Sequence, residues 1–172
     1  MTVEKEPPGK SIGKTMVIMA WIIILAFLTW IFGNLEQRET NPTQEVTSVI
    51  ENDSVSVTLE RNRFGHYFTN AEINGEKISV LLDTGATNIS IPLSLANKLQ
   101  LERGAAYQVE TANGTIWVNG TRLDSVAIGD IVLYDVRANI NPGLNEVLLG
   151  MSFLKQLEIT QRGNQLTLKQ YK

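Results

Sequence analysis

The chain has no cysteine and a single histidine among its 172 residues. Without cysteine it can form no disulfide framework, no thiolate metal site and no catalytic thiol. His66 has no serine or cysteine motif around it, so a catalytic triad is unsupported, and one histidine with scattered acids is a poor metal site. The formal net charge of −3 gives no support for nucleic-acid binding. We therefore expect no metal, no cofactor and no nucleic-acid partner.

Charge is also missing from one long run near the N-terminus. Residues 16–32 read MVIMAWIIILAFLTWIF, which is at the short end of what crosses a bilayer as a helix. The alternative is a cleaved signal peptide, but no small-x-small cleavage pattern follows the run directly. Lys5, Lys10 and Lys14 precede it, and Arg38 is the one cation that follows closely. The positive-inside rule then predicts a single-pass signal anchor over residues 16–33, with the N-terminus in the cytoplasm.

Four segments follow from this interpretation. Residues 1–15 are expected to be a cytoplasmic tail, 16–33 the transmembrane helix and 34–52 a polar, flexible tether. Residues 53–172 should fold outside the cytoplasmic (inner) membrane, in the periplasm or an equivalent extracytoplasmic space. Absence of cysteine does not identify that compartment.

The segment 53–172 reads as short strands separated by turn signals, which indicates an all-β barrel or sandwich. Val55, Val57 and Leu59 alternate on one face of the first strand, and Asn74-Gly75 and Asn113-Gly114 are strong hairpin signals. A short helical turn is expected at 151–157. We expect one helix at 92–101 and strands at 54–60, 67–73, 77–82, 88–91, 107–111, 115–118, 121–128, 131–140, 157–160 and 165–169.

The most informative stretch is residues 81–87, LLDTGAT. Two apolar residues end a buried strand, and Asp83 follows on a loop that Gly85 allows to turn sharply. An aspartate delivered from a buried strand is costly unless it is hydrogen-bonded or used. A second apolar run, residues 147–150 (VLLG), also ends in glycine. A turn-forming aspartate is the alternative interpretation of Asp83 taken alone.

Four motifs together resemble the bacterial, membrane-anchored, retropepsin-like aspartic proteases. They are DTGAT at 83–87, TANG at 111–114, VAIG at 126–129 and LLGMSFL at 148–154, in the family's order, within a match that covers roughly 64–168. The resemblance implies a small closed β-barrel with one short helix. It implies that Asp83 is the catalytic acid and that peptides are the substrates. The remaining site residues that it implies are Thr84, Gly85, Ala86, Leu148, Leu149 and Gly150 in support of the Asp83 loop, and Thr111, Ala112, Asn113, Gly114 and Thr115 in a flap over the substrate.

One chain carries a single Asp-Thr-Gly motif, whereas a water-activating dyad needs two carboxylates that share a proton. The second acid must therefore come from a second copy, which predicts a C2 homodimer with the site on its axis. Asp124, Asp130 and Asp135 lack the motif context, and one of them becomes a candidate only if the protein is a monomer. The predicted function is a membrane-tethered aspartic endopeptidase. The alternatives are a non-catalytic peptide-binding module and a structural anchor that serves only to dimerise single-span helices.

Two assignments stay open from sequence alone. The hairpin at 111–115 is interpreted as the flap because of its position between the two motif regions, but an ordinary surface hairpin has the same pattern. Trp117, which follows it, either lines a specificity pocket or packs in the core or against the hairpin.

Overall fold

The structure is a computed structural model that describes residues 9–40, 43, 45–112 and 114–172. The chain divides into two compact units, Met1–Arg38 and Glu39–Lys172. The helix α1 (Gly9–Thr40) is longer than the span expected at 16–33, and its side chains are described from residue 16 to residue 31. Asn113 of the predicted flap and residues 1–8 of the predicted tail lie outside the described residues.

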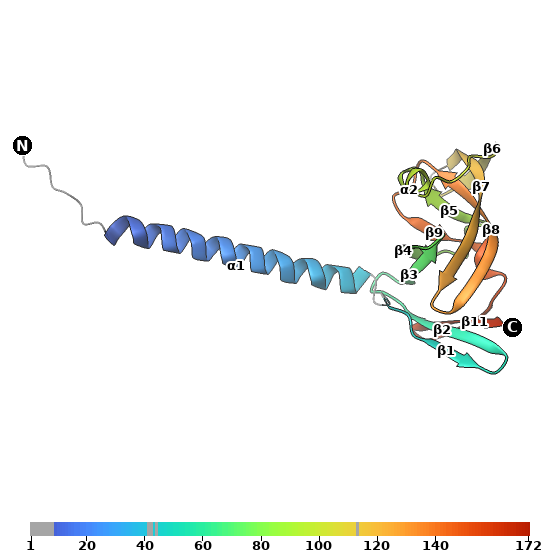
Figure 1. The fold of residues 1–172 in the computed structure, drawn as a ribbon, viewed down its shortest axis with the longest axis horizontal. Coiled ribbons are helices and arrows are strands. Elements are labelled where there is room, and N and C mark those ends of the chain that lie inside the picture. The colour runs from blue at the N-terminus through green and yellow to red at the C-terminus, as the bar shows by residue number, and fades with distance from the viewer. Residues whose placement is uncertain (1–8, 41–42, 44, 113) are drawn as a thin grey trace, which may run out of the picture. The chain divides into compact units, whose positions relative to one another are not determined.

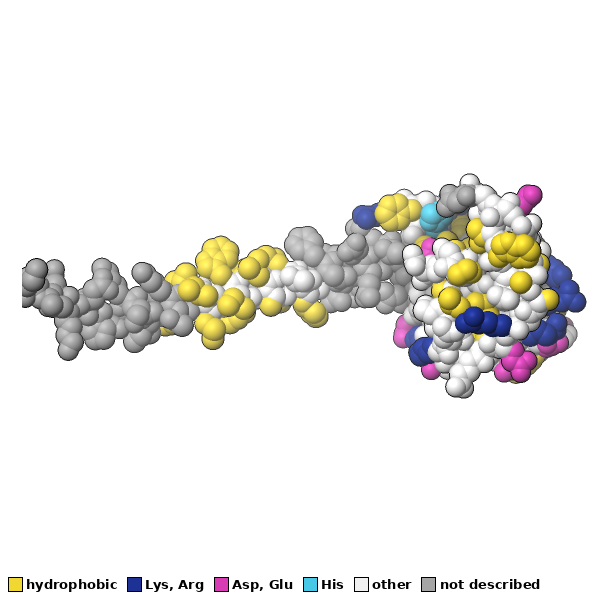
Figure 2. Space-filling view, turned by 90° about the horizontal axis from the view of Figure 1, so that it is seen from above, with side chains coloured by type: hydrophobic (Ala, Val, Ile, Leu, Met, Phe, Trp, Pro, Cys, Tyr) yellow, Lys and Arg dark blue, Asp and Glu magenta, His cyan; other side chains and the backbone are white. Residues whose placement is uncertain are grey.

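The described side chains of α1 are almost all hydrophobic and exposed, as the yellow stretch of the helix in Figure 2 shows. Among the described residues, no helix combines the length and the apolar character that crossing a bilayer requires. The structure therefore does not support the transmembrane helix expected at 16–33.

The second unit is built mainly from strands, as Figure 1 shows. Its seven-stranded sheet has the order β3-β4-β9-β5-β8-β7-β6, and β3 also pairs with β7. This additional pairing closes the ring β3-β4-β9-β5-β8-β7 into a barrel and leaves β6 outside it. The strands of this sheet are β3 (Phe68–Ile73), β4 (Glu76–Leu82), β5 (Ile89–Pro92), β6 (Ala106–Thr111), β7 (Gly114–Ile128), β8 (Ile131–Asn141) and β9 (Val147–Leu149).

A second sheet has four antiparallel strands in the order β1-β2-β11-β10. Its strands are β1 (Ser48–Glu51), β2 (Ser54–Glu60), β10 (Glu158–Arg162) and β11 (Gln165–Tyr171). The predicted alternation in β2 is confirmed, because Val55, Val57 and Leu59 are all buried, and the last two are at most 1% exposed. They join one apolar core with residues of the barrel.

Part of the segment 34–52, expected to be a flexible tether, is regular structure. Strand β1 pairs with β2, and Thr43 is buried, bridges to Thr69 and accepts a hydrogen bond from the Glu60 amide at 2.8 Å. Regular structure that belongs to the second unit is therefore already present before residue 53, at Thr43 and in β1.

The expected helix at 92–101 is shorter in the structure. Helix α2 (Leu93–Lys98) ends because Gln100 has a left-handed φ of +53°. The amides of Gln100 and Leu101 bond back to the carbonyls of Asn97 and Ala96 at 3.2 and 3.0 Å, which is a Schellman ending without glycine. A further short helix, α3 (Met151–Leu154), occupies the predicted helical turn.

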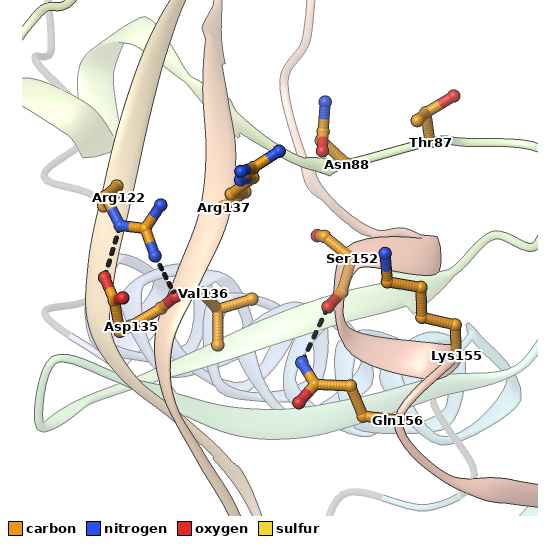
Figure 3. Close-up of a pocket in the computed structure, with 9 residues that line it drawn as sticks. All are labelled: Thr87, Asn88, Arg122, Asp135, Val136, Arg137, Ser152, Lys155 and Gln156. Atoms are coloured by element: carbon orange, nitrogen blue, oxygen red, sulfur yellow. Dashed lines mark hydrogen bonds and ion pairs between the residues drawn. The ribbon is translucent and has the colours of Figure 1, made fainter.

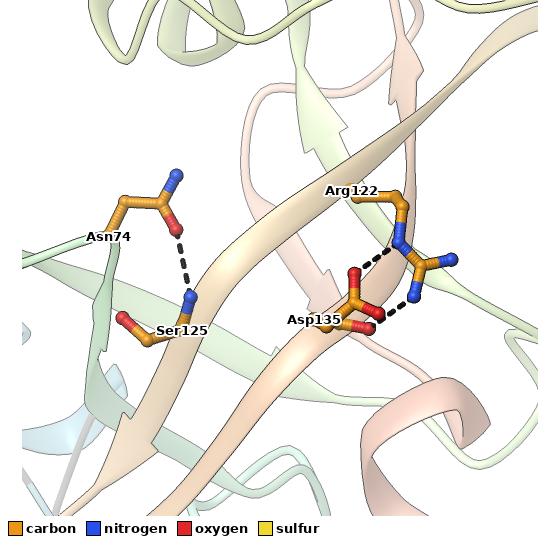
Figure 4. A network of polar contacts seen from close by, with 4 residues as sticks. All are labelled: Asn74, Arg122, Ser125 and Asp135. Atoms are coloured by element: carbon orange, nitrogen blue, oxygen red, sulfur yellow. Dashed lines mark hydrogen bonds and ion pairs between the residues drawn. The ribbon is translucent and has the colours of Figure 1, made fainter.

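The hairpin signal at Asn74-Gly75 is confirmed. The register pairs Ile73 with Glu76, and both turn residues have positive φ, at +50° and +83°, as a two-residue type I′ turn requires. The turn is also anchored to β7: the Asn74 amide donates to the Ser125 carbonyl, and the Asn74 side chain accepts from the Ser125 amide at 3.2 Å (Figure 4).

Candidate active site

Asp83 directly follows strand β4, at the point where that strand leaves its pairing with β9. The two strands are parallel, with Leu81 opposite Leu148 and Leu82 opposite Leu149. The Asp83 amide then donates to the Leu149 carbonyl at 3.1 Å. The structure therefore places the two motifs side by side, with the apolar run at 147–150 beside the strand that delivers the acid.

The Asp83 carboxylate is half-buried and is held by its own loop. Its Oδ1 accepts a hydrogen bond from the Gly85 amide at 2.8 Å, and the Asp83 carbonyl accepts one from the Ala86 amide at 3.2 Å. A β-carbon on Gly85 would lie 3.1 Å from Oδ1, so the close approach favours glycine. The Oδ2 atom has no hydrogen-bond partner in the described part of the chain, which leaves it available to a group from outside.

Gly150 brings the second motif into contact with the far end of the loop. A β-carbon there would lie 2.3 Å from the Asn88 carbonyl oxygen and 2.6 Å from that of Ala86. The φ of Gly150 is −91°, so close packing and not backbone conformation requires glycine. Leu149 beside it is fully buried, and Leu148 is half-buried. These three residues support the loop structurally.

The first residues of α3 then fasten the loop through hydrogen bonds. The Met151 amide donates to the Ala86 carbonyl at 2.8 Å, and the Ser152 amide donates to the Thr87 carbonyl at 2.9 Å. The buried Ser152 hydroxyl accepts from the Ile89 amide at 3.0 Å. Sequence analysis missed this role of Ser152, since a serine after an apolar run carries no signal for it.

Thr84 is exposed at the tip of the loop. Its hydroxyl makes no hydrogen bond to any residue that the structure describes. The loop of one chain thus presents a half-buried acid with an exposed hydroxyl beside it.

The predicted flap is the outer end of the hairpin formed by β6 and β7. Thr111 pairs with Gly114, which has a φ of +108°, and the Thr111 hydroxyl donates to the Gly114 carbonyl at 2.7 Å. Thr111, Ala112, Gly114 and Thr115 are all exposed. The hairpin is therefore free of the core at its end, as a flap must be.

Trp117 is 62% exposed on β7, so it does not pack in the core. It lies opposite Gln108 in the hairpin. At the base of the same hairpin, the Asn88 side chain lies 3.5 Å from the Tyr107 hydroxyl, which links the hairpin to the segment after the Asp83 loop. The indole of Trp117 is therefore on the surface of this hairpin.

The other acids do not assemble with Asp83. Asp124, Asp130 and Asp135 are exposed, and none of them contacts Asp83 through a hydrogen bond among the described residues. Asp135 instead pairs with Arg122 across β7 and β8, and Arg122 also donates to its carbonyl at 2.8 Å (Figure 4). The hydrogen bond from Arg122 lowers the pKa of Asp135 below its ordinary value, and the pKa of Arg122 is raised by the same bond.

His66 is exposed just before β3, with its ring edge-on to Phe68. In the part of the chain that the structure describes, no group of three or more His, Cys, Asp or Glu side chains could hold a metal ion. What the site offers chemically is one carboxylate per chain.

Comparison with known proteins places this arrangement in a family. Residues 69–156, just over half of the chain, match the model of the gag-polyprotein putative aspartyl proteases. The matched range contains the Asp83 loop, the hairpin of β6 and β7, and the run at 147–150.

Among curated proteins, the chain is 36% identical over 144 residues to an uncharacterized protein in the cobV 5′ region of a Sinorhizobium species, and this match covers 80% of the chain and 62% of that protein. It is 31% identical over 106 residues to an uncharacterized protein of Rickettsia prowazekii (strain Madrid E), with 59% of the chain and 46% of that protein covered. The chain thus spans about three fifths of the first relative and under half of the second.

Among solved structures, the crystal structure of a retropepsin-like aspartic protease from Rickettsia conorii is similar, with a TM-score of 0.59 and 27% identity over 74% of this chain and 97% of that one. The EIAV protease complexed with the inhibitor HBY-793 gives a TM-score of 0.45 and 24% identity, over 55% of this chain and 89% of that one. The family model and the Rickettsia conorii structure confirm the retropepsin-like fold expected from the four motifs. The chain belongs to the gag-polyprotein putative aspartyl proteases, a family of retropepsin-like aspartic proteases.

Proposed function

We propose that the protein is an aspartic endopeptidase whose active site forms between two copies of the chain. The observation that carries this proposal is the half-buried Asp83 carboxylate, which has one unbonded oxygen and is fixed through the other by the Gly85 amide. Gly150 packs closely against the Ala86 and Asn88 carbonyls of the same loop segment. Family membership supports the same chemistry. In the proposed site the Asp83 pair shares one proton, because two carboxylates at close range cannot both ionise.

In this mechanism the ionised Asp83 takes a proton from a water molecule, which attacks the scissile carbonyl. The protonated Asp83 of the second copy donates a hydrogen bond to the carbonyl oxygen as charge develops there. In the proposed dimer the Thr84 hydroxyl, which is exposed in the single chain, ties the two loops together. The hairpin of β6 and β7 closes over an extended peptide and excludes water.

The dimer is supported by counting the acids, since one chain provides one Asp-Thr-Gly, and Asp124, Asp130 and Asp135 make no hydrogen bond to Asp83 in the described part of the chain. The test is subunit mixing with the full chain. If wild type is mixed with a roughly ninefold excess of Asp83→Asn chains and allowed to exchange, activity per wild-type chain should fall to about a tenth, because random pairing leaves few wild-type pairs. Asp124→Asn chains in the same excess are the control and should leave activity unchanged.

Dilution provides the second arm of this test. Specific activity should fall as the dimer dissociates. A strictly monomeric protein by analytical ultracentrifugation that still cleaves peptides at full rate would contradict the shared site. So would full activity in the Asp83→Asn mixture once subunit exchange has been verified. Peptide binding without hydrolysis would favour the binding module instead.

Attachment to the cytoplasmic membrane is a separate part of the proposal. It rests on the uncharged run at 16–32 and on the lysines that precede it, which favour a cytoplasmic N-terminus and an extracytoplasmic protease domain. Exported or membrane-associated proteins would then be the accessible substrates, since tethering raises their local concentration. A reporter fused after Lys172 should be extracytoplasmic, and a cytoplasmic reporter would contradict the location while leaving the chemistry untouched.

A further inference from the structure

A hollow of about 420 Å³ lies beside the segment that follows the Asp83 loop. Three parts of the fold line it: Thr87 and Asn88 of that segment, the facing strands β7 and β8, and the end of helix α3 with the residues after it. Its charged side chains are Arg122, Arg137, Lys155 and Asp135. Three cations and one carboxylate give the hollow an excess of positive charge in a chain whose net charge is −3.

The two arginines of the hollow are directly opposed neighbours on the paired strands β7 and β8. The register pairs Arg122 with Arg137, and like charges at directly opposed positions are unfavourable. Asp135 forms an ion pair with Arg122 and interacts with Arg137 only through space; the side chains of Arg137 and Lys155 make no hydrogen bond or ion pair to any residue that the structure describes. The arrangement therefore leaves two cations without a bonded carboxylate.

Both of these cations are directed into the hollow. Figure 3 shows Arg137 extending from β8 towards the side of Asn88, and Lys155 turning its ammonium group from the end of α3 towards the same space. An anion between them would gain two charge-assisted contacts and would relieve the repulsion between the arginines.

The hollow is also adjacent, along the chain, to the proposed catalytic loop. Thr87 and Asn88 come directly after the Asp83–Ala86 turn, and α3 holds this segment through the Ser152 amide. The chain from Asp83 to Asn88 can extend at most about 17 Å. An extended peptide advances about 3.3 Å per residue, so the hollow lies within about five residues of a bond cleaved at Asp83.

From this juxtaposition we infer that the hollow is a substrate subsite that selects an acidic side chain, aspartate or glutamate, within about five residues of the scissile bond, with Arg137 and Lys155 as its specificity-determining residues. The inference rests on the proposed peptidase function. Because residues that line the hollow follow the loop directly in sequence, we favour a side chain of the bound peptide over a free anion as the ligand.

The test uses the full chain and extended peptide libraries in which one position at a time is fixed as Glu or as Gln. Wild type should prefer Glu by roughly three- to tenfold at one position near the cleaved bond, the range expected for partly exposed ion pairs. The preference should weaken as salt is raised, because these charges are accessible to counterions. Mass spectrometry of the products locates the preferred position.

Substitutions of the two cations test whether the preference for Glu comes from the hollow. Arg137→Gln and Lys155→Gln should each reduce the Glu preference and together abolish it, while cleavage of the Gln library continues. Arg162→Gln, which removes an exposed cation of β10 outside the hollow, is the control and should retain the preference. An equal preference for Glu at every position would show general charge attraction and would overturn the subsite.

Binding separates failure of the subsite from failure of the proposed function. The same peptides are titrated against Asp83→Asn chains by fluorescence anisotropy, with and without the Arg137→Gln and Lys155→Gln changes. One outcome is that Asp83→Asn chains bind Glu peptides better, that these two changes abolish this preference, and that wild type cleaves nothing. It would uphold the subsite and contradict the peptidase. Cleavage of both libraries at equal rates would uphold the peptidase and overturn the subsite. Absence of both binding and cleavage would contradict both.

Discussion

Gly150→Ala is expected to damage both the stability of the barrel and the geometry of the proposed active site. The added β-carbon would lie 2.3 Å from the Asn88 carbonyl oxygen, whereas an ordinary contact begins at 3.4 Å, so the loop segment must move by about 1 Å. Overpacking of this kind costs about 1–3 kcal/mol. The two hydrogen bonds from the Met151 and Ser152 amides contribute about 1 kcal/mol each and would weaken with it. Together these contributions predict a loss of about 3 kcal/mol, within a range of about 1–5 kcal/mol, in the free energy of unfolding.

The same displacement moves the loop that carries Asp83. A misplacement of about 1 Å at a reacting group can reduce the rate by about a hundredfold, so peptide hydrolysis should fall further than the fraction of folded protein explains. Urea unfolding followed by circular dichroism gives the stability, and hydrolysis at a temperature where the variant is folded gives the rate.

Gly120→Ala is the matched control for this change. Its β-carbon would meet its nearest atoms at 3.7 Å, an ordinary contact, and its φ is not in the left-handed region. We expect its stability to stay within about 1 kcal/mol of wild type. If Gly150→Ala is as stable and as active as wild type, the argument that the run at 147–150 holds the Asp83 loop in position is refuted.

Two further predictions test the hairpin and the charged pair. Trp117→Ala should leave the free energy of unfolding within about 0.5 kcal/mol of wild type, because the indole is 62% exposed. The same change should raise KM for peptides if the hairpin covers them, and an unchanged KM would contradict the flap. Arg122→Gln should raise the pKa of Asp135 towards its ordinary value, as NMR titration of the side-chain carboxyl would show. Because the folded-state pKa of Asp135 is lowered, the stabilising contribution of its ion pair is present above the ordinary pKa and is lost as pH falls through the folded-state pKa. An Asp135 pKa that does not change in Arg122→Gln would contradict the pairing.

Sequence alone predicted the parts of the fold that local chemistry determines. Alternation placed Val55, Val57 and Leu59 in the core, and Asn74-Gly75 predicted a turn that needs two residues with positive φ. The adjacency of the Asp83 loop and the run at 147–150 followed from the motifs. Each of these predictions depends on a few neighbouring residues or on the pairing of the two motifs at 83–87 and 147–150.

Other features depend on contacts that a local pattern does not encode. The glycine at position 120 predicts a break between two strands, but β7 continues through it. The Gly120 amide donates a hydrogen bond to the Ala105 carbonyl at 3.0 Å, which keeps this residue in the strand. Strand β1 lies in a polar stretch with mostly exposed residues, so no hydrophobic period marks it. The opposition of Arg122 and Arg137 depends on the register of β7 and β8, and Lys155 joins them only through the position of α3.

The most direct test of the central claim is peptide hydrolysis by wild type and by Asp83→Asn, purified side by side. The change is nearly isosteric, so circular dichroism and unfolding should match. Wild type should cleave peptides with a bell-shaped dependence on pH whose limbs belong to the pair of carboxylates, and chelators should have no effect. Asp83→Asn should be slower by at least about 10²–10⁴-fold, the contribution of general acid–base catalysis. Full activity in Asp83→Asn, or activity that chelators abolish and zinc restores, would contradict the account.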